Sequence, residues 1–538
     1  MSLSKHEGQA TVRRSVAAGT SLLVAALLTL AGERPGTAAA ADAAALYATH
    51  CASCHGADRL GGMGPALLPE NLGRLKPAEA AKVVAEGRAA TQMTGFGDKL
   101  DEAGVAALVA LIYTPLPDAP RWGLEEIEAS RQVLVAAEEL PARPVHDSDP
   151  LNLFVVVESG DHHVTILDGD RFEPIARFPS RFALHGGPKF SPDGRFVYFA
   201  SRDGWITKYD LWGLRVVAEA RAGINTRNLA ISHDGRVLAV ANYLPHSLVL
   251  LDAADLSPIE TIAAEDWRGK TSSRVSAVYQ AAPRQSFIVA LKDVPELWEV
   301  SYAEVPPPDY AGFVHNYEKG MVEAIPAEAT RFPIRRILLD EPLDDFFIDP
   351  SYRTVVGSAR DGERAVAVHL DVRRAIAELP LPGLPHLGSG ISWLRQGRRV
   401  LATPHLKEGV VSVIDLEDWR VVKRIATLGP GFFLRSHENS RYAWVDASLG
   451  AQRDAVQIID KETLEIVATL RPAPGKTAAH VEFTRDGRYA LLSIWEMDGA
   501  IVVYDAETLV EVKRIPAVKP SGKYNVYNKI ARSDGTSH

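Results

Sequence analysis

Cysteine is almost absent from this chain, because only two of its 538 residues are cysteines, Cys51 and Cys54. Such a chain cannot hold a framework of several disulfides. A zinc site built from two cysteine pairs is excluded as well, because no second pair exists. The two cysteines lie three positions apart and His55 follows them directly. The whole cysteine content therefore belongs to one short motif.

Positive charge is also in short supply. The chain has 59 Lys and Arg residues against 68 Asp and Glu residues, which gives a formal net charge of -9. A chain with this balance offers no broad basic surface, so we expect no nucleic-acid partner. Its length exceeds what one hydrophobic core usually serves, and two or more domains are expected.

Long hydrophobic runs are missing except near the N-terminus. The run from Val16 to Ala31 is shorter than the roughly 20 residues that a membrane-spanning helix needs. Basic residues precede it (Lys5, Arg13 and Arg14), and small residues follow it from Thr37 to Ala41. This order is typical of a signal peptide, predicted over residues 1–41, and it indicates a periplasmic protein with no membrane span after cleavage. The alternative is a retained membrane anchor.

The motif that uses both cysteines reads Cys51-Ala52-Ser53-Cys54-His55, the attachment pattern of a c-type haem. Two thiols one helical turn apart can each form a thioether to one haem, and the adjacent histidine can then bind the iron. The alternatives are a CxxC disulfide and half of a zinc site. We predict one covalent haem c with His55 as an axial ligand.

The residues around this motif predict a small all-α class I cytochrome c domain over residues 42–120. Helices are expected over residues 43–50, 77–88 and 101–113. The loop before the third helix contains Met93 and resembles the sixth-ligand loop of class I cytochromes c, so Met93 is the predicted second iron ligand. Met63 is the competing methionine, and core filling is the other interpretation of Met93.

An acidic, proline-rich linker is predicted over residues 121–150, with a helix from Trp122 to Glu139.

From residue 151 to residue 538 the sequence repeats with a period of roughly 40 to 50 residues, as the blades of a β-propeller do. Turns such as Asp193-Gly194 separate runs of β-branched and aromatic residues. Eight such units predict an all-β eight-bladed propeller, with seven blades as the structural rival and an insert over residues 302–335.

Several motifs occur in an order that resembles the cytochrome cd1 family over nearly all of the mature chain. They are Phe182-Ala183-Leu184-His185, Ser201-Arg202-Asp203-Gly204, Asp210-Leu211-Trp212, His480-Val481-Glu482-Phe483, Ser493-Ile494-Trp495 and the closing run from Pro520 to Asn528. The resemblance implies a second, non-covalent cofactor, haem d1, on the propeller axis. It further implies that His185 is the proximal iron ligand, that Arg202 and Arg227 face the carboxylates of the ring, and that Trp495 packs on it. Core packing and inter-blade ion pairs are the plain alternatives for these residues.

Nitrite reductases of this family carry two distal histidines above haem d1. His386, in Leu384-Pro385-His386-Leu387-Gly388, matches the second of them. At the first position the alignment places Asp344, and a carboxylate that is normally ionised at neutral pH is a poor neighbour for nitrite. This departure weakens the expectation of nitrite reduction.

A group within the family, the dihydro-haem d1 dehydrogenases, has the same two modules and is the closer resemblance. It implies oxidation of one propionate of dihydro-haem d1 to an acrylate, with the electrons passing to haem c and then to a periplasmic acceptor. His386 is then a candidate base or distal ligand, Asp344 a weaker candidate base, and His405 a further pocket candidate. Two other interpretations stay open: a nitrite reductase with an altered pocket, and a non-enzymatic haem d1 carrier or electron-transfer protein. The nitrite reductase that receives haem d1 is a candidate partner.

Overall fold

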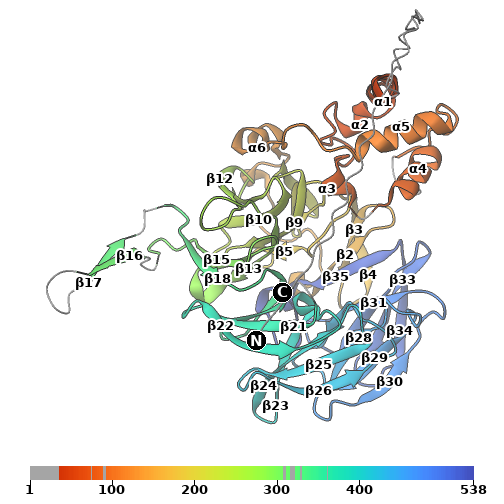
Figure 1. Ribbon diagram of the computed structural model, residues 1–538. Coiled ribbons are helices and arrows are strands. Elements are labelled where there is room, and N and C mark those ends of the chain that lie inside the picture. The colour runs from red at the N-terminus through yellow and green to blue at the C-terminus, as the bar shows by residue number, and fades with distance from the viewer. Residues whose placement is uncertain are drawn as a thin grey trace, which may run out of the picture.

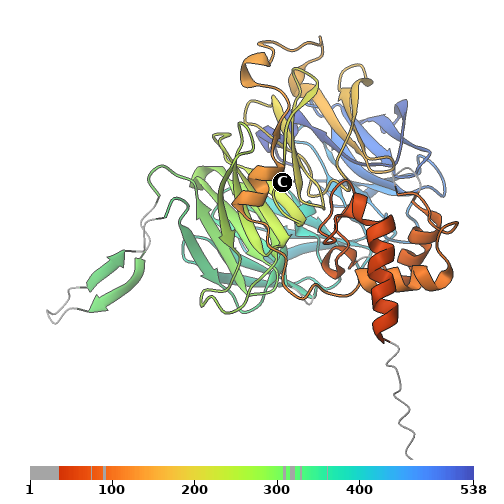
Figure 2. The same ribbon diagram turned by 90° about the horizontal axis from the view of Figure 1, so that it is seen from above.

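A computed structural model describes residues 36–73, 75–88, 93–306, 310–315, 322–326, 330–359 and 362–537. Most of the predicted signal peptide, including the apolar run from Val16 to Ala31, lies outside the described residues. Helices occupy the N-terminal part of the chain and strands the rest, and the helical part packs on one side of a ring of sheets (Figures 1 and 2).

The N-terminal helices form a small bundle of their own. They are α1 (Gly36–His50), α2 (Ala52–His55), α3 (Pro69–Leu72), α4 (Pro77–Glu86) and α5 (Glu102–Ile112). The predicted helices over 43–50, 77–88 and 101–113 are confirmed to within two residues at the ends that they share with α1, α4 and α5. The α5 helix begins where the Asp101 carboxylate accepts a hydrogen bond from the Gly104 amide, and its apolar face packs into the bundle core with Tyr47 and Leu72.

The prediction of one helix from Trp122 to Glu139 is wrong. The segment forms a short helix, α6 (Leu124–Ser130), then a strand, β1 (Gln132–Val133), then a 3-10 turn, η1 (Ala137–Glu139). Tertiary contacts override local helix preference here, because β1 pairs with the edge of a propeller sheet and Ile127 is fully buried against the same sheet.

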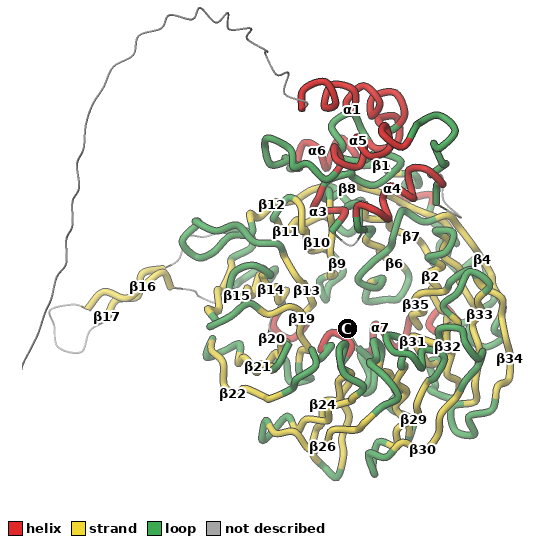
Figure 3. The backbone as a smooth tube through the Cα atoms, turned by 45° about the vertical axis from the view of Figure 1, so that its right-hand side comes forward, coloured by secondary structure: helices red, strands yellow, loops and turns green. Residues whose placement is uncertain are grey.

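The C-terminal part consists of four-stranded antiparallel sheets, eight of them among the described residues, arranged as blades around an axis (Figure 3). This arrangement confirms the predicted eight-bladed propeller. From the innermost strand outward, blade 1 is β35 (Pro520–Asn525), β2 (Leu153–Glu158), β3 (His163–Asp168) and β4 (Glu173–Pro179). Blade 2 is β5 (Lys189–Phe190), β6 (Phe196–Ala200), β7 (Trp205–Asp210) and β8 (Arg215–Arg221).

The remaining blades follow the same order. Blade 3 is β9 (Asn225–Ile231), β10 (Val237–Leu244), β11 (Ser247–Asp252) and β12 (Pro258–Ala263). Blade 4 is β13 (Val275–Ala281), β14 (Ser286–Leu291), β15 (Glu296–Ser301) and β18 (Ile334–Leu338), and blade 5 is β19 (Leu343–Ile348), β20 (Thr354–Ala359), β21 (Arg364–His369) and β22 (Arg374–Pro380). Blade 6 is β23 (Ile391–Arg395), β24 (Arg398–Pro404), β25 (Val410–Asp415) and β26 (Arg420–Ala426). Blade 7 is β27 (Leu434–Arg435), β28 (Tyr442–Asp446), β29 (Val456–Asp460) and β30 (Ile466–Leu470), and blade 8 is β31 (Ala478–Phe483), β32 (Tyr489–Ile494), β33 (Gly499–Asp505) and β34 (Glu511–Ala517).

The same turn joins the two inner strands in several blades. In blade 2 the Ser191 hydroxyl donates to the Asp193 carboxylate, and Gly194 has a φ of +75°, a conformation that favours glycine. Ser232 and Asp234 repeat this contact in blade 3, and Thr484 and Asp486 repeat it in blade 8. The repeated sequence therefore produces a repeated hairpin.

The two ends of the chain close the ring, because β35 pairs with β2 and completes blade 1. The predicted insert is confirmed between β15 and β18, where β16 (Tyr310–His315) and β17 (Val322–Pro326) form a hairpin that projects from the ring (Figure 1). The short 3-10 turns η2 (Pro150–Asn152), η3 (Ala282–Arg284) and η4 (Leu387–Ser389) and the helix α7 (Val526–Ala531) complete the fold.

The antiparallel order of each blade gives the ring two distinct rims. We call the upper rim the set of loops that lead into each innermost strand, and the lower rim the set of turns at which the innermost strands end. The segment 526–537 follows β35 and crosses the lower rim, where it contacts blade 6 through Gly535 and blade 7 through Ser436.

The helical bundle docks on the upper rim at blades 2 and 3. The side chain of Asn71 donates to the Ile224 carbonyl at 3.0 Å, and Arg221 at the end of β8 donates to the carbonyl of Leu60. Arg221 also donates to the Asp203 carbonyl at 2.9 Å and lies over the ring of Trp122 at 4.5 Å. One buried arginine therefore links the bundle, the 121–150 segment and the propeller.

Candidate functional site: two tetrapyrrole sites at one rim of a propeller

The first site is the CxxCH motif. Cys51 immediately precedes α2, and Cys54 and His55 lie within it, so one helical turn presents both thiols beside the histidine. His55 is largely buried, and its Nδ1 lies 2.7 Å from the Pro65 carbonyl, which fixes the ring and leaves Nε2 for a metal. These residues fit a covalent haem c.

The predicted methionine ligand lies at the edge of the described residues. Met93 is half-buried, and its carbonyl accepts a hydrogen bond from the Arg88 amide at 2.9 Å. Met63 is 70% exposed on the loop after the motif, where the Gly64 amide donates to the Cys54 carbonyl. Ligation of iron by Met93 stays a prediction, because residues 89–92 lie outside the described part of the chain.

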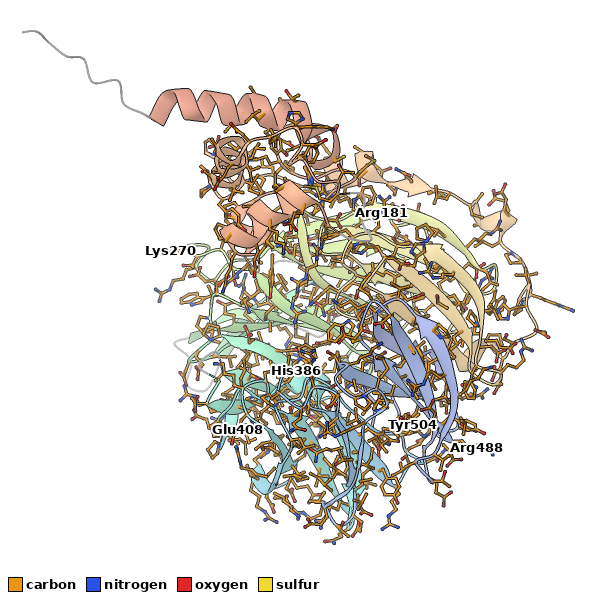
Figure 4. All side chains as sticks on the ribbon, turned by 90° about the vertical axis from the view of Figure 1, so that its right-hand side faces the viewer. Arg181, Lys270, His386, Glu408, Arg488 and Tyr504 are labelled. Carbon is orange, nitrogen blue, oxygen red and sulfur yellow. The ribbon has the colours of Figure 1, made fainter. Side chains whose placement is uncertain are left out.

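Two histidines reach the interior of the ring from opposite sides. His185 lies on the loop into blade 2 and His386 on the loop into blade 6, and these blades are four positions apart in a ring of eight. Figure 4 labels His386 among the side chains of the propeller. Such a pair can face the two sides of a planar ligand between them.

Backbone contacts orient both of these rings. Nδ1 of His185 lies 2.7 Å from the Arg227 carbonyl, and Nδ1 of His386 lies 2.7 Å from the Phe432 carbonyl. Each contact orients the ring so that Nε2, and not Nδ1, is the nitrogen turned away from that carbonyl. The guanidinium of Arg227 lies 3.1 Å from Nε2 of His185, so it must turn aside before that nitrogen can bind a metal. Burial lowers the pKa of His386, which favours the neutral form, and the Asp345 carboxylate opposes this effect.

The two adjacent aspartates at the start of blade 5 have different partners. A bulge between Leu343 and Phe346 exposes both side chains to the upper rim. Asp344 forms an ion pair with Lys292, whereas Asp345 accepts a hydrogen bond from the Tyr279 hydroxyl at 3.1 Å and lies against Gly388, two residues after His386. The carboxylate beside His386 is therefore that of Asp345, and the role of Asp344 as a base stays a prediction.

The other predicted pocket residues have different surroundings. Arg202 is half-buried at the upper rim, where its amide donates to the Ala183 carbonyl at 3.1 Å. Trp495 follows β32, and its buried Nε1 has no hydrogen-bond partner among the described residues, so it can donate to a ligand. The interpretation of His405 as a pocket residue is wrong, because this fully buried ring uses both nitrogens, one near the Pro382 carbonyl and one near the Ser412 hydroxyl.

His480, which the sequence analysis places in a family motif without a role, is a further residue of the site. It sits at a bulge in β31 with a φ of +53°, a strained conformation for a histidine. It is 1% exposed, packs against the rings of Phe433 and Tyr524, and has no partner for Nε2 in the described structure. Burial, with the nearby Lys523 and Arg435, holds its pKa well below the usual value. His480 is therefore a neutral imidazole with one open nitrogen.

Cations surround this histidine. Lys523 donates to the His480 carbonyl and, at 2.8 Å, to the Ser493 hydroxyl, and burial lowers its pKa to about 7. Arg435 is also buried, and its Nε has no partner among the described residues. Buried cations with spare donors suit an anionic ligand. The interior of the ring thus fits a planar, carboxylate-bearing tetrapyrrole held between His185 and His386.

The fold and its two sites define a class: a c-type cytochrome docked on a propeller that encloses a second tetrapyrrole. A family model described as cytochrome D1 heme domain matches residues 148–529, and one described as cytochrome C oxidase, cbb3-type, subunit III matches residues 38–112. The chain belongs to the cytochrome D1 heme domain family. Among the described residues, no helix is long and apolar enough to cross a membrane.

Comparison with individual proteins shows which members of this family the chain resembles. The chain is 58% identical to the dihydro-heme d1 dehydrogenase of Pseudomonas aeruginosa, over 98% of this chain and 100% of the relative. It is 26% identical to the nitrite reductase of Stutzerimonas stutzeri, over 90% of this chain and 92% of the relative. The solved structure of the dihydro-heme d1 dehydrogenase NirN in complex with DHE superimposes with a TM-score of 0.85 at 59% identity, and the match covers 91% of this chain and 100% of that one.

Proposed function

We propose that this protein oxidises dihydro-haem d1 to haem d1 by converting one propionate side chain to an acrylate. The observation that carries the proposal is His480, a neutral imidazole with an open nitrogen on the inner wall of a ring whose upper rim also holds a c-type cytochrome. The 58% identity to a dihydro-heme d1 dehydrogenase supports the same reaction.

The reaction removes two electrons and two protons from the –CH2–CH2– unit of the propionate, and we assign the electrons to haem c, one proton to His480 and the second proton to solvent. His480 is the proposed base, because a histidine that stays neutral near pH 7 can accept a proton from carbon-bound hydrogen. Tyr524 packs on His480 with a ring-centroid distance of 5.2 Å, and burial raises its pKa to about 12, so its hydroxyl stays a donor. Arg435 and Lys523 are the proposed partners of the substrate carboxylates.

The other predicted residues take supporting roles in this proposal. His185 and His386 hold the substrate iron from opposite sides, and Arg202, Arg227 and Trp495 are the proposed contacts to the rest of the ring. Asp344 has no part in proton transfer, because Lys292 already neutralises it.

The electrons leave through the cytochrome part. Haem c, when bound at Cys51, Cys54 and His55, supplies a one-electron acceptor. It must therefore be reoxidised twice for each substrate molecule that is oxidised. We therefore propose a periplasmic electron acceptor as a partner, with export directed by the predicted signal peptide. The nitrite reductase that uses haem d1 is the proposed recipient of the product.

The two other interpretations of the sequence have less support. A nitrite reductase would need a second distal acid, and the aligned residue, Asp344, is bound to a lysine. A pure carrier would have no use for an open neutral base or for a docked cytochrome.

The test is anaerobic incubation of the purified holo-protein with dihydro-haem d1 and an artificial electron acceptor. We expect the ring spectrum to change to that of haem d1 over many turnovers. A parallel sample receives haem d1, a reductant and nitrite, and nitric oxide is assayed. An unchanged ring spectrum would remove the dehydrogenase, and sustained nitric oxide formation would favour the reductase.

A further inference from the structure

A second charged space lies at the lower rim, where the proposed oxidation makes no use of it. A cavity of about 190 Å³ separates the C-terminal segment from blades 2 to 4. Its lining includes three cationic side chains, those of Lys189, Lys529 and Arg532, and no carboxylate is found among the described lining residues.

These three cations have few anionic partners. The Lys189 ammonium donates only to the carbonyls of Gly186 and Gly187 in the described structure, at 3.0 and 3.4 Å. The Arg532 guanidinium donates to the Gln280 carbonyl and the Tyr352 hydroxyl, both at 3.1 Å. Lys529 alone approaches a carboxylate, that of Glu482 at 3.5 Å. Among the described residues, one carboxylate thus lies within 4 Å of these three cations, and the Asp345 carboxylate acts on Lys189 from farther away.

An uncommitted hydroxyl points to a ligand as well. Ser537 lines the same cavity and is 7% exposed, and its Oγ has no partner among the described residues. A buried hydroxyl without a partner costs free energy unless something occupies the space beside it.

Burial and charge repulsion both act on the pKa values of the two lysines in the cavity. Burial, together with repulsion from Lys529 and Arg532, lowers the pKa of Lys189 to about 7. Burial likewise lowers the pKa of Lys529 to about 8. An anion between these groups would remove the repulsion and keep both lysines charged.

We propose that this cavity is an oxyanion-binding site in which Lys189, Lys529, Arg532 and Ser537 hold a carboxylate, sulfate or phosphate group. Lys189 follows His185 by four residues, and its ammonium binds the two carbonyls directly after that histidine. An anion on Lys189 therefore stabilises the loop that presents the iron ligand. The anion is either a carboxylate of the tetrapyrrole that reaches the lower rim or a small free oxyanion.

Calorimetric titration with sulfate tests the site, because sulfate keeps its charge between pH 6 and pH 9. The protein that carries haem c but neither haem d1 nor dihydro-haem d1 should bind one sulfate. Lys189→Gln and Arg532→Gln should each weaken binding by about tenfold or more, since each removes a charge-assisted hydrogen bond. Lys189→Arg should retain binding, and Lys270→Gln, a change of an exposed lysine on the outer surface (Figure 4), should match the parent.

Two further arms of the experiment identify the anion and its charge dependence. If bound haem d1 abolishes sulfate binding, the natural anion is the ring carboxylate; if sulfate still binds, it is a free oxyanion. Sulfate affinity should fall between pH 7 and pH 9 as Lys189 and Lys529 lose protons. The other titratable or charged groups around them in the described structure are Arg435, Arg532, Asp345, Glu482, His233, Tyr279 and Tyr524.

The contrary results are equally specific. Absence of saturable sulfate binding would overturn the proposal, and so would equal affinity in the parent, Lys189→Gln and Lys270→Gln. Circular dichroism and the haem c spectrum verify that each variant is folded. Because no substrate is turned over, either contrary result would leave the proposed oxidation untouched.

Discussion

His480 combines a strained backbone, full burial and an open ring nitrogen. Replacement by alanine removes the proposed base, so His480→Ala should slow oxidation of dihydro-haem d1 by about 100-fold or more. Tetrapyrrole binding should persist, because His185 and His386 remain. The measurement is the single-turnover change of the ring spectrum, with His369→Ala on the outer part of blade 5 as the matched control. Equal rates in the His480 variant and the control would remove His480 from the mechanism.

The pH profile follows from the same residue. Its pKa lies well below 6.5, so His480 stays neutral through the range in which an ordinary histidine gains a proton. The single-turnover oxidation rate at saturating substrate should therefore be flat from pH 8 to below pH 6.5 and fall only at lower pH, whereas titration of Lys523 near pH 7 should change substrate affinity. A rate that halves near pH 6.5 would indicate a base with an ordinary pKa. Stopped-flow records of the ring spectrum across this range decide between them.

Replacement of Asp344 is expected to have little effect on the oxidation rate. Because its carboxylate is held by Lys292 and is not the one beside His386, Asp344→Asn should change the oxidation rate by less than about threefold, whereas removal of a positioned base costs far more. Steady-state kinetics with dihydro-haem d1 provide the test. A loss as large as that of His480→Ala would restore Asp344 as the base.

At the residue scale, local motifs were predictable and long-range pairings were not. The CxxCH motif identifies its haem because its ligands are neighbours in sequence. His480 depends on Phe433, Tyr524 and Lys523, which are more than 40 residues away, and nothing in one sequence indicates that a bulge leaves its Nε2 open. The proximity of Asp345 to His386 was not predicted for a related reason, because it depends on a bulge that one sequence does not reveal.

Between elements, the contact at Arg221 joins the cytochrome to the propeller. It is 4% exposed, and it binds the Leu60 carbonyl, the Asp203 carbonyl and the face of Trp122. Arg221→Ala should loosen the docking and slow electron transfer from bound substrate to haem c by more than about tenfold, because small displacements of reacting groups are costly. Rapid reduction of haem c by bound substrate is the measurement, and an unchanged haem c spectrum shows that the cytochrome is intact. Arg488→Gln, on the outer surface (Figure 4), is the control.

Helices and strands were predicted correctly where a sequence pattern repeats. They were predicted wrongly where pairing with a distant segment determines the local structure. The Ser-x-Asp-Gly turns predicted the inner hairpins of blades 2 and 3, because the hydroxyl, the carboxylate and the glycine act within five residues. The 122–139 segment has an ordinary helical pattern, but pairing of β1 with β8 converts its middle into a strand. Closure of blade 1 by β35 joins residues more than 360 apart, and only the family resemblance suggested it.

At the scale of the whole molecule, the two rims differ in how substrate, product and electrons can reach the sites. The segment 526–537 crosses the lower rim, whereas His185 lies on an upper-rim loop and the cytochrome docks at the upper rim. We therefore expect substrate and product to pass the rim on which the cytochrome docks. The same arrangement gives electrons a short route between the two sites, since the loop into blade 3 touches α3 directly.

The most direct test of this account is anaerobic mixing of oxidised holo-protein with one equivalent of dihydro-haem d1 and no other acceptor, followed at the absorption bands of both tetrapyrroles. The account predicts that haem c is reduced at the rate at which the substrate spectrum changes, and that full conversion to haem d1 needs a second acceptor. Oxidation of the substrate while haem c stays oxidised would contradict it.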